Sequence, residues 1–213
     1  MIRILLADDH AIMRDGLRYI LGTQPDMTVV AEAYNGRAAL AVVAAEAPDL
    51  VIMDIGMPEM NGIEATRLIR QLHPGTRVVM LSVYSTTEHV CQALAAGAGG
   101  YVLKEAAGQE LVAAVRAVHG NRRFLSRKID PVLVDRYCDT RSLAKSPLTR
   151  LSERERLVMQ LVVEGHTSAA IATRLGLSPK TVETYRSRLM QKLDIHDIPG
   201  LVKFAIQHGL TTI

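Results

Sequence analysis

Residues 50–62 read LVIMDIGMPEMNG, an apolar run that ends in Asp54 and continues into a loop with proline and glycine. A short run that is apolar at every position is typical of a strand buried on both faces of a parallel sheet. The chain has runs of strand length at Ile2–Ala7, Met27–Ala33, Leu50–Asp54, Arg77–Ser82 and Gly100–Lys104. Such repetition over the first 120 residues predicts a doubly wound sheet with five parallel strands.

Helix-like segments follow each of these runs. They lie at Ala11–Leu21, Gly36–Ala47, Ile63–Leu72, Thr86–Ala96 and Gln109–His119. Their ends have ordinary helix signals, because Asn35 can cap the second segment and Pro48 and Pro74 follow the ends of two others. The alternation of strand and helix predicts a flavodoxin-like α/β domain.

Composition excludes several classes of protein. Of the 213 residues, 48% are hydrophobic and 22% are charged, which is typical of a globular protein and not of a disordered one. No apolar run reaches the roughly 18 residues of a membrane span, and Asp8 and Asp9 interrupt the N-terminus too early for a signal peptide. The two cysteines, Cys91 and Cys138, are too few for a disulfide scaffold. We therefore expect a reduced, cytoplasmic protein without a membrane partner.

Charge divides the chain unevenly. Residues 1–120 carry nine Lys/Arg against thirteen Asp/Glu, residues 121–146 carry seven against three, and residues 147–213 carry nine against six. An acidic first part and a basic second part predict two domains with different partners. We expect domains at 1–120 and 147–213, joined by a partly helical linker at 121–146.

Polar side chains gather where the predicted strands end. Asp8 and Asp9 follow the first strand, and Asp54, Ser82 and Lys104 end three others. Ligands of a parallel sheet bind at this carboxyl edge. Carboxylates so close together need a cation, and hard oxygen ligands with open positions suit Mg²⁺ and phosphate oxygens. The pattern predicts a site that holds one carboxylate bearing a phosphoryl group.

Four motifs carry a resemblance to a known family: ADDH (7–10), DIGMPEMNG (54–62), Ser82 and YVLK (101–104). With them, residues 1–120 closely resemble a two-component receiver domain. The resemblance implies that Asp54 is the phosphoacceptor, phosphorylated by a partner sensor histidine kinase. It also implies that Asp9, Asp54 and the carbonyl of Gly56 bind Mg²⁺ directly, while Asp8 acts mainly through water. By the same resemblance, Ser82 and Lys104 contact the phosphoryl group. The side chain of Tyr101 moves when Ser82 shifts toward the phosphate.

The loop after Asp54 contains Asn61-Gly62, a pair that is typical of a tight turn with positive φ. Gly56 offers no side chain to an attacking water, so the lifetime of a phosphoryl group stays open.

From Leu151 onward the pattern is helical. Ser152 and Glu155 have the spacing of a capping box. Gly165 and Gly176 end the first two helices, with Thr167 or Ser168 as the cap of the second. Ser178-Pro179 opens a third helix that reaches about Leu193, and a fourth extends from Pro199 to a stop at Gly209. Two helices joined by a short turn with glycine fit a helix-turn-helix.

The third of these helices has two different faces. Val182, Leu189 and Leu193 lie on one side, as expected for packing. The opposite side carries Lys180, Glu183, Thr184, Ser187 and Gln191, flanked by Arg188. Such side chains can contact base edges or phosphates in a DNA groove.

The stretches 151–165, 177–193 and 201–206 resemble a LuxR-type helix-turn-helix domain, and the whole chain resembles a NarL/FixJ-type response regulator. The resemblance implies groove contacts by Lys180, Glu183, Thr184 and Ser187, and phosphate contacts by Thr181, Arg186 and Arg188. Because a single small domain of modest net charge has too few phosphate contacts to bind tightly, we also expect a homodimer on phosphorylation and an operator with inverted half-sites. One departure is Ser168-Ala169-Ala170, where the family usually has Asn-Lys-Glu, so a Glu that often supports the reading helix is absent.

Two alternatives remain. One is a DNA-binding regulator controlled by a protein or a small ligand without phosphorylation. The other is a Mg²⁺-dependent phosphohydrolase, which needs a general acid and a substrate cap that the first domain does not offer. No GxGxxG or P-loop motif is present, so we expect a regulator and not an enzyme.

Overall fold

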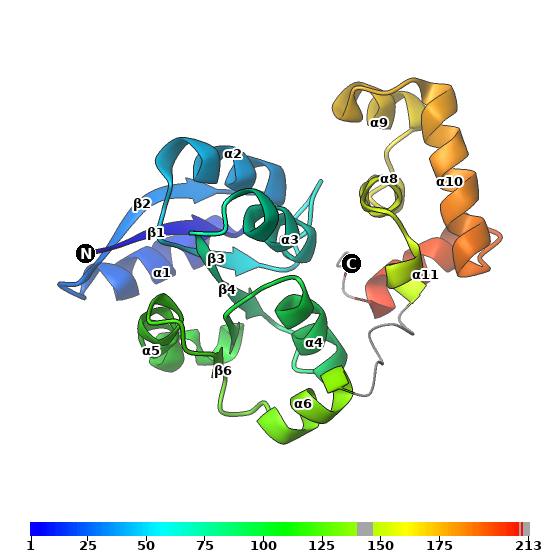
Figure 1. The fold of residues 1–213 in the computed structure, drawn as a ribbon. Helices are drawn as coiled ribbons and strands as arrows, with labels where there is room; N and C mark the ends of the chain where they lie inside the picture. The colour runs from blue at the N-terminus through cyan, green and yellow to red at the C-terminus, as the bar shows by residue number, and fades with distance from the viewer. Residues whose placement is uncertain (140–146, 209, 211–213) are drawn as a thin grey trace. The chain divides into compact units, whose positions relative to one another are not determined.

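The computed structural model describes residues 1–139, 147–208 and 210, and the chain forms two compact units, Met1–Thr140 and Arg141–Ile213 (Figure 1). The first unit is α/β and the second is helical, as the sequence predicts. Among the described residues, no helix combines the length and the apolar character that crossing a membrane requires.

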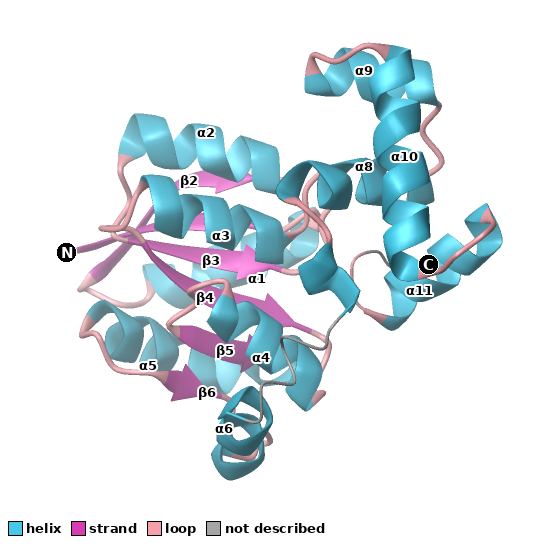
Figure 2. Cartoon of the chain, turned by 45° about the vertical axis from the view of Figure 1, so that its right-hand side comes forward, coloured by secondary structure: helices cyan, strands magenta, loops and turns pink. Residues whose placement is uncertain are grey.

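The first unit is built on a parallel sheet in the order β2-β1-β3-β4-β5-β6. Its first five strands are β1 (Ile2–Ala7), β2 (Met27–Ala33), β3 (Leu50–Asp54), β4 (Arg77–Ser82) and β5 (Gly100–Leu103). The helices are α1 (Ala11–Gly22), α2 (Gly36–Glu46), α3 (Gly62–Leu72), α4 (Thr87–Ala95) and α5 (Ala107–His119). Helices α1 and α5 cover one face of the sheet, and α2, α3 and α4 cover the other (Figures 1 and 2).

The core explains why the central strands are largely apolar. All five residues of β3 are buried, and so are the last five of β4. Side chains such as Ile4, Ile52 and Leu81 pack against α1 or α5 on one face, while their neighbours in sequence point to the other face. Burying one such side chain stabilises the fold by roughly 1.5–3 kcal/mol.

The sheet has six strands, where the sequence predicts five. The extra strand, β6 (Phe124–Leu125), pairs in parallel with Gly100 and Tyr101 of β5. Ser126 holds it in place, because its Oγ accepts a hydrogen bond from the Leu103 amide at 3.0 Å and donates one to Glu110. A strand of two residues shows no periodicity, so only its partner strand reveals it.

A further helix, α6 (Pro131–Asp139), packs beside α4 (Figures 1 and 2). Residues 121–139, which we expected to be part of a linker, therefore lie within the first unit. Residues 140–146 of the expected linker lie outside the described residues.

The expectation of reduced cysteines is wrong for this structure, since Cys91 of α4 and Cys138 of α6 form a disulfide. The two cysteines are 47 residues apart, and only the packing of α6 on α4 brings them together.

The second unit begins with a short 3₁₀ helix, η2 (Pro147–Arg150), and contains α8 (Glu153–Val163), α9 (Ser168–Leu175), α10 (Pro179–Leu193) and α11 (Ile198–Gln207). Ser152 and Glu155 form the expected capping box on α8. The cap of α9 is Thr167, one of the two expected residues, and Gly176 ends α9 with φ 66°. The expected stop at Gly209 lies outside the described residues.

Candidate functional site

The expected acidic site lies at the carboxyl edge of the first unit's sheet. Asp8 and Asp9 directly follow β1, and Asp54 and Ser82 are the last residues of β3 and β4. Lys104 follows β5 as the first residue of a 3₁₀ turn, η1 (Lys104–Ala106). Because these strands are parallel neighbours in the sheet, their ends bring together side chains that are far apart in sequence.

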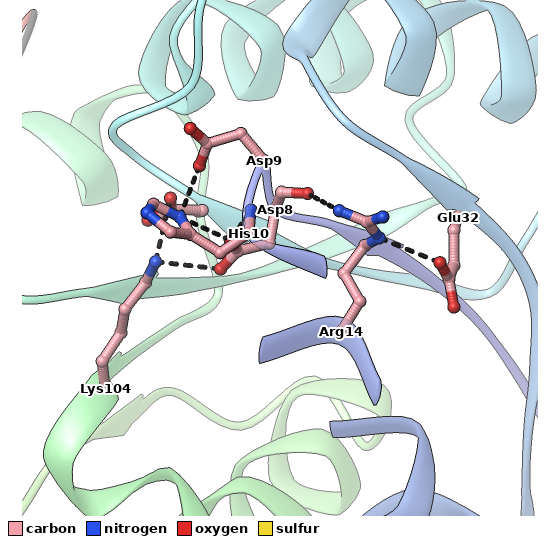
Figure 3. Close-up of polar contacts among 7 residues, drawn as sticks. Asp8, Asp9, His10, Arg14, Glu32 and Lys104 are labelled. Carbon is pink, nitrogen blue, oxygen red and sulfur yellow. Dashed lines mark hydrogen bonds and ion pairs between the residues drawn. The ribbon is translucent and has the colours of Figure 1, made fainter. Parts of the chain in front are cut away.

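The Lys104 ammonium group lies between two carboxylates of this edge. Its Nζ is 2.9 Å from Oδ2 of Asp8 and 3.0 Å from Oδ2 of Asp54. Figure 3 shows the contact between the Lys104 and Asp8 side chains as a dashed line. All three residues are largely withdrawn from solvent, with 12% of the Lys104 side chain exposed and less of the two carboxylates. The ion pairs therefore hold Asp54 in a defined position at the sheet edge.

Burial and charge act in opposite directions on the acid–base properties of this cluster. Burial raises the pKa of Asp54, and the Asp8 carboxylate adds to the rise, while Lys104 lowers it without cancelling it. Burial lowers the pKa of Lys104, but the carboxylates of Asp54 and Asp8 outweigh that effect and leave it above its ordinary value. The site thus keeps a cation beside carboxylates that repel one another.

The donor set suits a hard cation. Ligand atoms of Asp8, Asp9, His10 and Asp54 all lie within 4.8 Å of one another. Opposite ligands of Mg²⁺, at roughly 2.1 Å from the metal, are about 4.2 Å apart, so carboxylate oxygens can reach one ion here with small movements. The first unit therefore carries an acidic cluster of the kind that binds Mg²⁺.

His10 is part of this cluster, although sequence reasoning assigned it no role. Its Nδ1 lies 2.8 Å from Oδ1 of Asp9 and 3.2 Å from Oδ1 of Asp8 (Figure 3). Its backbone N–H donates to Asp8 Oδ1 at 2.8 Å, and it occupies the N-cap position of α1 without a capping hydrogen bond from its side chain. The signal available in the sequence was only its position next to the two aspartates.

The loop after Asp54 departs from expectation. Asn61 has φ −69° and caps α3 by accepting from the Glu64 amide at 3.0 Å, so the predicted turn with positive φ at Asn61-Gly62 is wrong. The positive φ in this loop, 65°, belongs to Glu59. Gly62 is required for a different reason, since a Cβ there would lie 1.9 Å from the Asp54 carbonyl oxygen. Gly56 is half-buried between Asp54 and this turn.

Ser82 and Tyr101 are linked through the loop after β4. Ser82 is buried and its Oγ accepts from the Tyr84 amide at 3.0 Å. The Tyr101 hydroxyl donates to the Tyr84 carbonyl at 2.7 Å, and the Tyr101 side chain is fully buried. The Tyr84 ring stacks on His89 of α4, with ring centroids 4.4 Å apart. A contiguous set of contacts therefore leads from the acidic edge to α4.

In the second unit, α10 has the two faces that the sequence predicts. Val182 and Leu189 are fully buried in the core of this unit, and Leu193 packs at its edge. The exposed side carries Lys180, Glu183, Thr184, Ser187 and Arg188. Thr181 and Arg186 are half-buried at the sides of this surface. The expected DNA-contacting residues therefore lie on one continuous surface of α10.

Two contacts organise the ends of α10. Ser178 caps its first turn by accepting from the Thr181 amide at 3.1 Å, and the two hydroxyl groups lie 2.8 Å apart. Near the other end, Lys192 Nζ lies 2.7 Å from Oε2 of Glu155. Sequence reasoning assigned Glu155 to the cap of α8 but did not find its contact with α10.

Comparison with known proteins agrees with this architecture. Residues 4–116 match the family model of the response regulator receiver domain. Residues 149–205 match that of the bacterial regulatory proteins of the luxR family.

Similar proteins align along nearly the whole chain. It is 40% identical to the uncharacterized transcriptional regulatory protein YhcZ of Bacillus subtilis, covering 98% of this chain and 97% of YhcZ. It is 39% identical to the response regulator UvrY of Escherichia coli O6:H1, covering 99% and 96%. The solved structure of the Salmonella typhimurium RcsB response regulator matches with a TM-score of 0.58 at 25% identity, covering 97% and 100%. On these matches and the two sites described above, the chain belongs to the NarL/FixJ-type response regulators, DNA-binding transcription regulators that two-component systems control by phosphorylation.

Proposed function

We propose that Asp54 is the phosphoacceptor of this regulator and receives its phosphoryl group from a partner sensor histidine kinase. The observation that carries the proposal is the position of Lys104, whose ammonium group lies 3.0 Å from Asp54 and 2.9 Å from Asp8 at the open edge of the sheet. A cation held there can contact a phosphoryl oxygen on Asp54 without leaving the site.

In the transfer, an Asp54 carboxylate oxygen attacks the phosphorus atom of the donor, and the bond from phosphorus to the leaving group breaks. Lys104 keeps Asp54 oriented and then contacts the new phosphoryl group. Ser82, at the end of the neighbouring strand, offers a hydroxyl to another phosphoryl oxygen. The buried setting strengthens both interactions, since less water competes for them.

Asp8, Asp9, Asp54 and the carbonyl of Gly56 are the groups that we propose hold Mg²⁺, with Asp8 acting mainly through water. The chemistry that a bound Mg²⁺ supplies is neutralisation of the charge on the carboxylates and on the incoming phosphoryl oxygens. The cluster of ligand atoms within 4.8 Å supports this assignment.

We propose that phosphorylation is sensed through Ser82 and Tyr101. A Ser82 hydroxyl that turns toward the phosphoryl group releases the Tyr84 amide, which it now binds at 3.0 Å. The carbonyl of Tyr84 is in turn held by Tyr101. Movement of Tyr84 therefore changes the position of the Tyr101 hydroxyl and of α4.

On α10, we propose base contacts by Lys180, Glu183, Thr184 and Ser187, and phosphate contacts by Thr181, Arg186 and Arg188. The exposure of the first four residues and the half-burial of Thr181 and Arg186 support this division, because a helix in the major groove meets base edges with its outermost face. Arg188 is exposed too, and its place at the flank of that face assigns it to a phosphate. Residues at the flanks of that face meet the backbone.

We propose residues 1–120 as the phosphoacceptor domain, 121–146 as the connection, of which residues 121–139 pack within the first unit, and 147–213 as the DNA-binding domain. We propose further that the protein works in the cytoplasm, forms a homodimer on phosphorylation and binds inverted half-sites. A cytoplasmic location is supported by its membership in a family whose members bind DNA.

The phosphoacceptor assignment is tested by incubating the protein with acetyl phosphate and Mg²⁺ and measuring its intact mass. We expect one added phosphoryl group, lost in Asp54→Asn and retained in the control Asp15→Asn, which changes an exposed aspartate of α1. Labelling of Asp54→Asn at the wild-type rate would refute the assignment. Absence of labelling in every variant would favour control by a protein or a small ligand.

A further inference from the structure

Cys91 and Cys138 are the only cysteines of the chain, and they are bonded to each other. Their Cα atoms are 5.9 Å apart, a separation that suits a disulfide without movement of the backbone. Cys91 is fully buried in α4, while Cys138 is partly exposed in the last turn of α6. Cys138 is therefore the more accessible of the two cysteines to a small thiol or disulfide in solution.

The surroundings also accommodate the reduced form. Cys91 Sγ lies 3.4 Å from the carbonyl oxygen of Val134, so a thiol at this position has a hydrogen-bond acceptor. Val134 is buried and fixes α6 on α4 by its own packing, and Asp135 pairs with Arg123 at 2.6 Å. Reduction therefore removes one of several links between α6 and the rest of the unit without exposing an unpaired buried group.

The disulfide joins two segments with different tasks. Helix α4 contacts the loop after Ser82, because His89 stacks on Tyr84 and its Nδ1 lies 2.6 Å from Thr86 Oγ1. Helix α6 ends at Asp139, directly before the residues that connect the two units. The bond thus ties the helix next to the acidic site to the start of the connection.

Cysteines of cytoplasmic proteins are normally reduced, and a disulfide that forms there is usually transient and serves catalysis or redox sensing. Neither Cys91 nor Cys138 lies in the acidic cluster or on α10, so neither proposed site uses the pair.

We propose that Cys91 and Cys138 form a reversible thiol–disulfide site, and that the oxidised state fastens α6 to α4 and reduces the effect of phosphorylation on DNA binding. The second part rests on the proposed function, whereas the first rests on the disulfide and on the proposed cytoplasmic location.

The oxidant is a low-molecular-weight disulfide. The Cys138 thiolate attacks one sulfur of the oxidant, which forms a mixed disulfide and releases one thiol. The Cys91 thiolate then attacks the Cys138 sulfur and releases the second thiol. The two protein sulfurs are oxidised by two electrons in total, the oxidant is reduced to two thiols, and the two thiol protons leave with them.

The thiol–disulfide site is tested by equilibrating the full chain with defined mixtures of reduced and oxidised glutathione and alkylating the free thiols under denaturing conditions. We expect two alkyl groups per chain in the reduced limit and none in the oxidised limit, with no cross-linked dimer. Cys138→Ser should keep one alkylated cysteine in all mixtures. Two alkylated cysteines in the wild-type chain throughout would overturn the proposal.

The fastening of α6 is tested by amide hydrogen exchange of residues 131–139. We expect slower exchange in the oxidised wild-type chain than in the reduced one, and no redox dependence in Cys138→Ser. Asp135→Asn is the matched control, because it removes a different contact of α6, the ion pair with Arg123, and leaves both cysteines in place. Amide exchange of α6 in Asp135→Asn should be faster overall, yet it should still differ between the oxidised and reduced chains. Equal exchange in the oxidised and reduced wild-type chain would overturn this part.

The effect on signalling is tested by measuring the gain in DNA affinity that beryllofluoride produces. We expect the gain in DNA affinity to be at least about fivefold larger for the reduced chain than for the oxidised one, which is a typical size for coupling between two sites. Cys138→Ser should show the reduced value in both conditions. An equal gain in both redox states would refute the coupling. No gain in either state would refute the proposed function, while alkylation and exchange still decide the disulfide.

Discussion

At the scale of single residues, Asp54, the proposed phosphoacceptor, occupies a position that is unfavourable for stability. It is 4% exposed, and two further aspartates approach it at the edge of the sheet. Lys104 offsets part of the repulsion, yet burial and the neighbouring carboxylates leave the pKa of Asp54 above its ordinary value. The charged form is therefore less favourable in the folded chain than in the unfolded one.

Asp54→Asn should consequently stabilise the first unit. Because the folded pKa is raised above the ordinary 3.8, the destabilising effect of Asp54 is absent at a pH below 3.8 and develops as the pH rises through the folded pKa. We expect a gain of about 1 kcal/mol in the free energy of unfolding at neutral pH. Thermal melts across this pH range, without Mg²⁺, measure the gain.

The control for this prediction is Asp15→Asn, which alters an exposed carboxylate of α1 and should leave the melting temperature nearly unchanged. A neutral-pH melting temperature of Asp54→Asn below that of the wild-type chain would show that the ion pair with Lys104 outweighs the cost of burial.

Gly62 illustrates a different constraint on a single residue. A side chain there would collide with the backbone of Asp54, so the glycine lets α3 begin directly beside the proposed phosphoacceptor. The local pair Asn61-Gly62 is typical of a turn, and only the close approach to β3 shows what the glycine is for.

At the scale of elements, α10 combines a packing face with an exposed polar face. Val182 and Leu189 fix its orientation in the core, and this leaves Glu183, Thr184 and Ser187 exposed on the other side. Lys192 ties α10 to the capping residue of α8. Burial raises the pKa of Glu155, but its contacts with Lys192 and Ser152 lower it more, so its pKa lies below the ordinary value. The lowered pKa favours the charged carboxylate in these contacts.

The two kinds of contact on α10 should respond differently to mutation. Arg188→Ala should weaken binding to every DNA sequence and reduce the salt dependence by about one phosphate contact. Glu183→Ala should change binding to random DNA little, but relax the base preference at one position of each half-site by about 1–3 kcal/mol. Selection of sites from a random DNA pool at fixed salt, run with both variants, separates these effects.

Glu183 has a simpler possible role, which is to offset the charge of nearby arginines. In that case its removal would tighten binding to all sequences alike. A selected motif that is the same for Glu183→Ala and for the wild-type chain would disprove its assignment as a base-reading residue.

At the scale of the whole molecule, one small basic unit offers few phosphate contacts. Residues 147–213 carry nine Lys/Arg against six Asp/Glu, a modest excess for tight binding by a single copy. Two copies whose reading helices lie about one turn of DNA apart, roughly 34 Å, can bind a symmetric operator together.

We therefore expect phosphorylation to favour a homodimer. Beryllofluoride with Mg²⁺ serves as the phosphoryl mimic, and sedimentation of the full chain should show a shift from monomer toward dimer. Asp54→Asn should remain at the monomer position under the same conditions. Identical sedimentation of the wild-type chain with and without the mimic would contradict this prediction.

The sequence by itself determined the features that depend on neighbours along the chain. The first five strands were predicted because short, largely apolar runs alternate with helical segments, and the cap of α8 because Ser152 and Glu155 are three residues apart. The convergence of Asp8, Asp54 and Lys104 was also predicted, since the ends of parallel strands meet at one edge.

Only the tertiary structure decided the features that depend on contacts between distant segments. Strand β6 exists because the edge of β5 is open to it, and its two residues have no pattern of their own. The Cys91–Cys138 disulfide and the contact of Lys192 with Glu155 join residues 47 and 37 positions apart. Local propensity and periodicity act over a few residues, so they place strands and caps, whereas partners across the fold are chosen by how the finished elements pack.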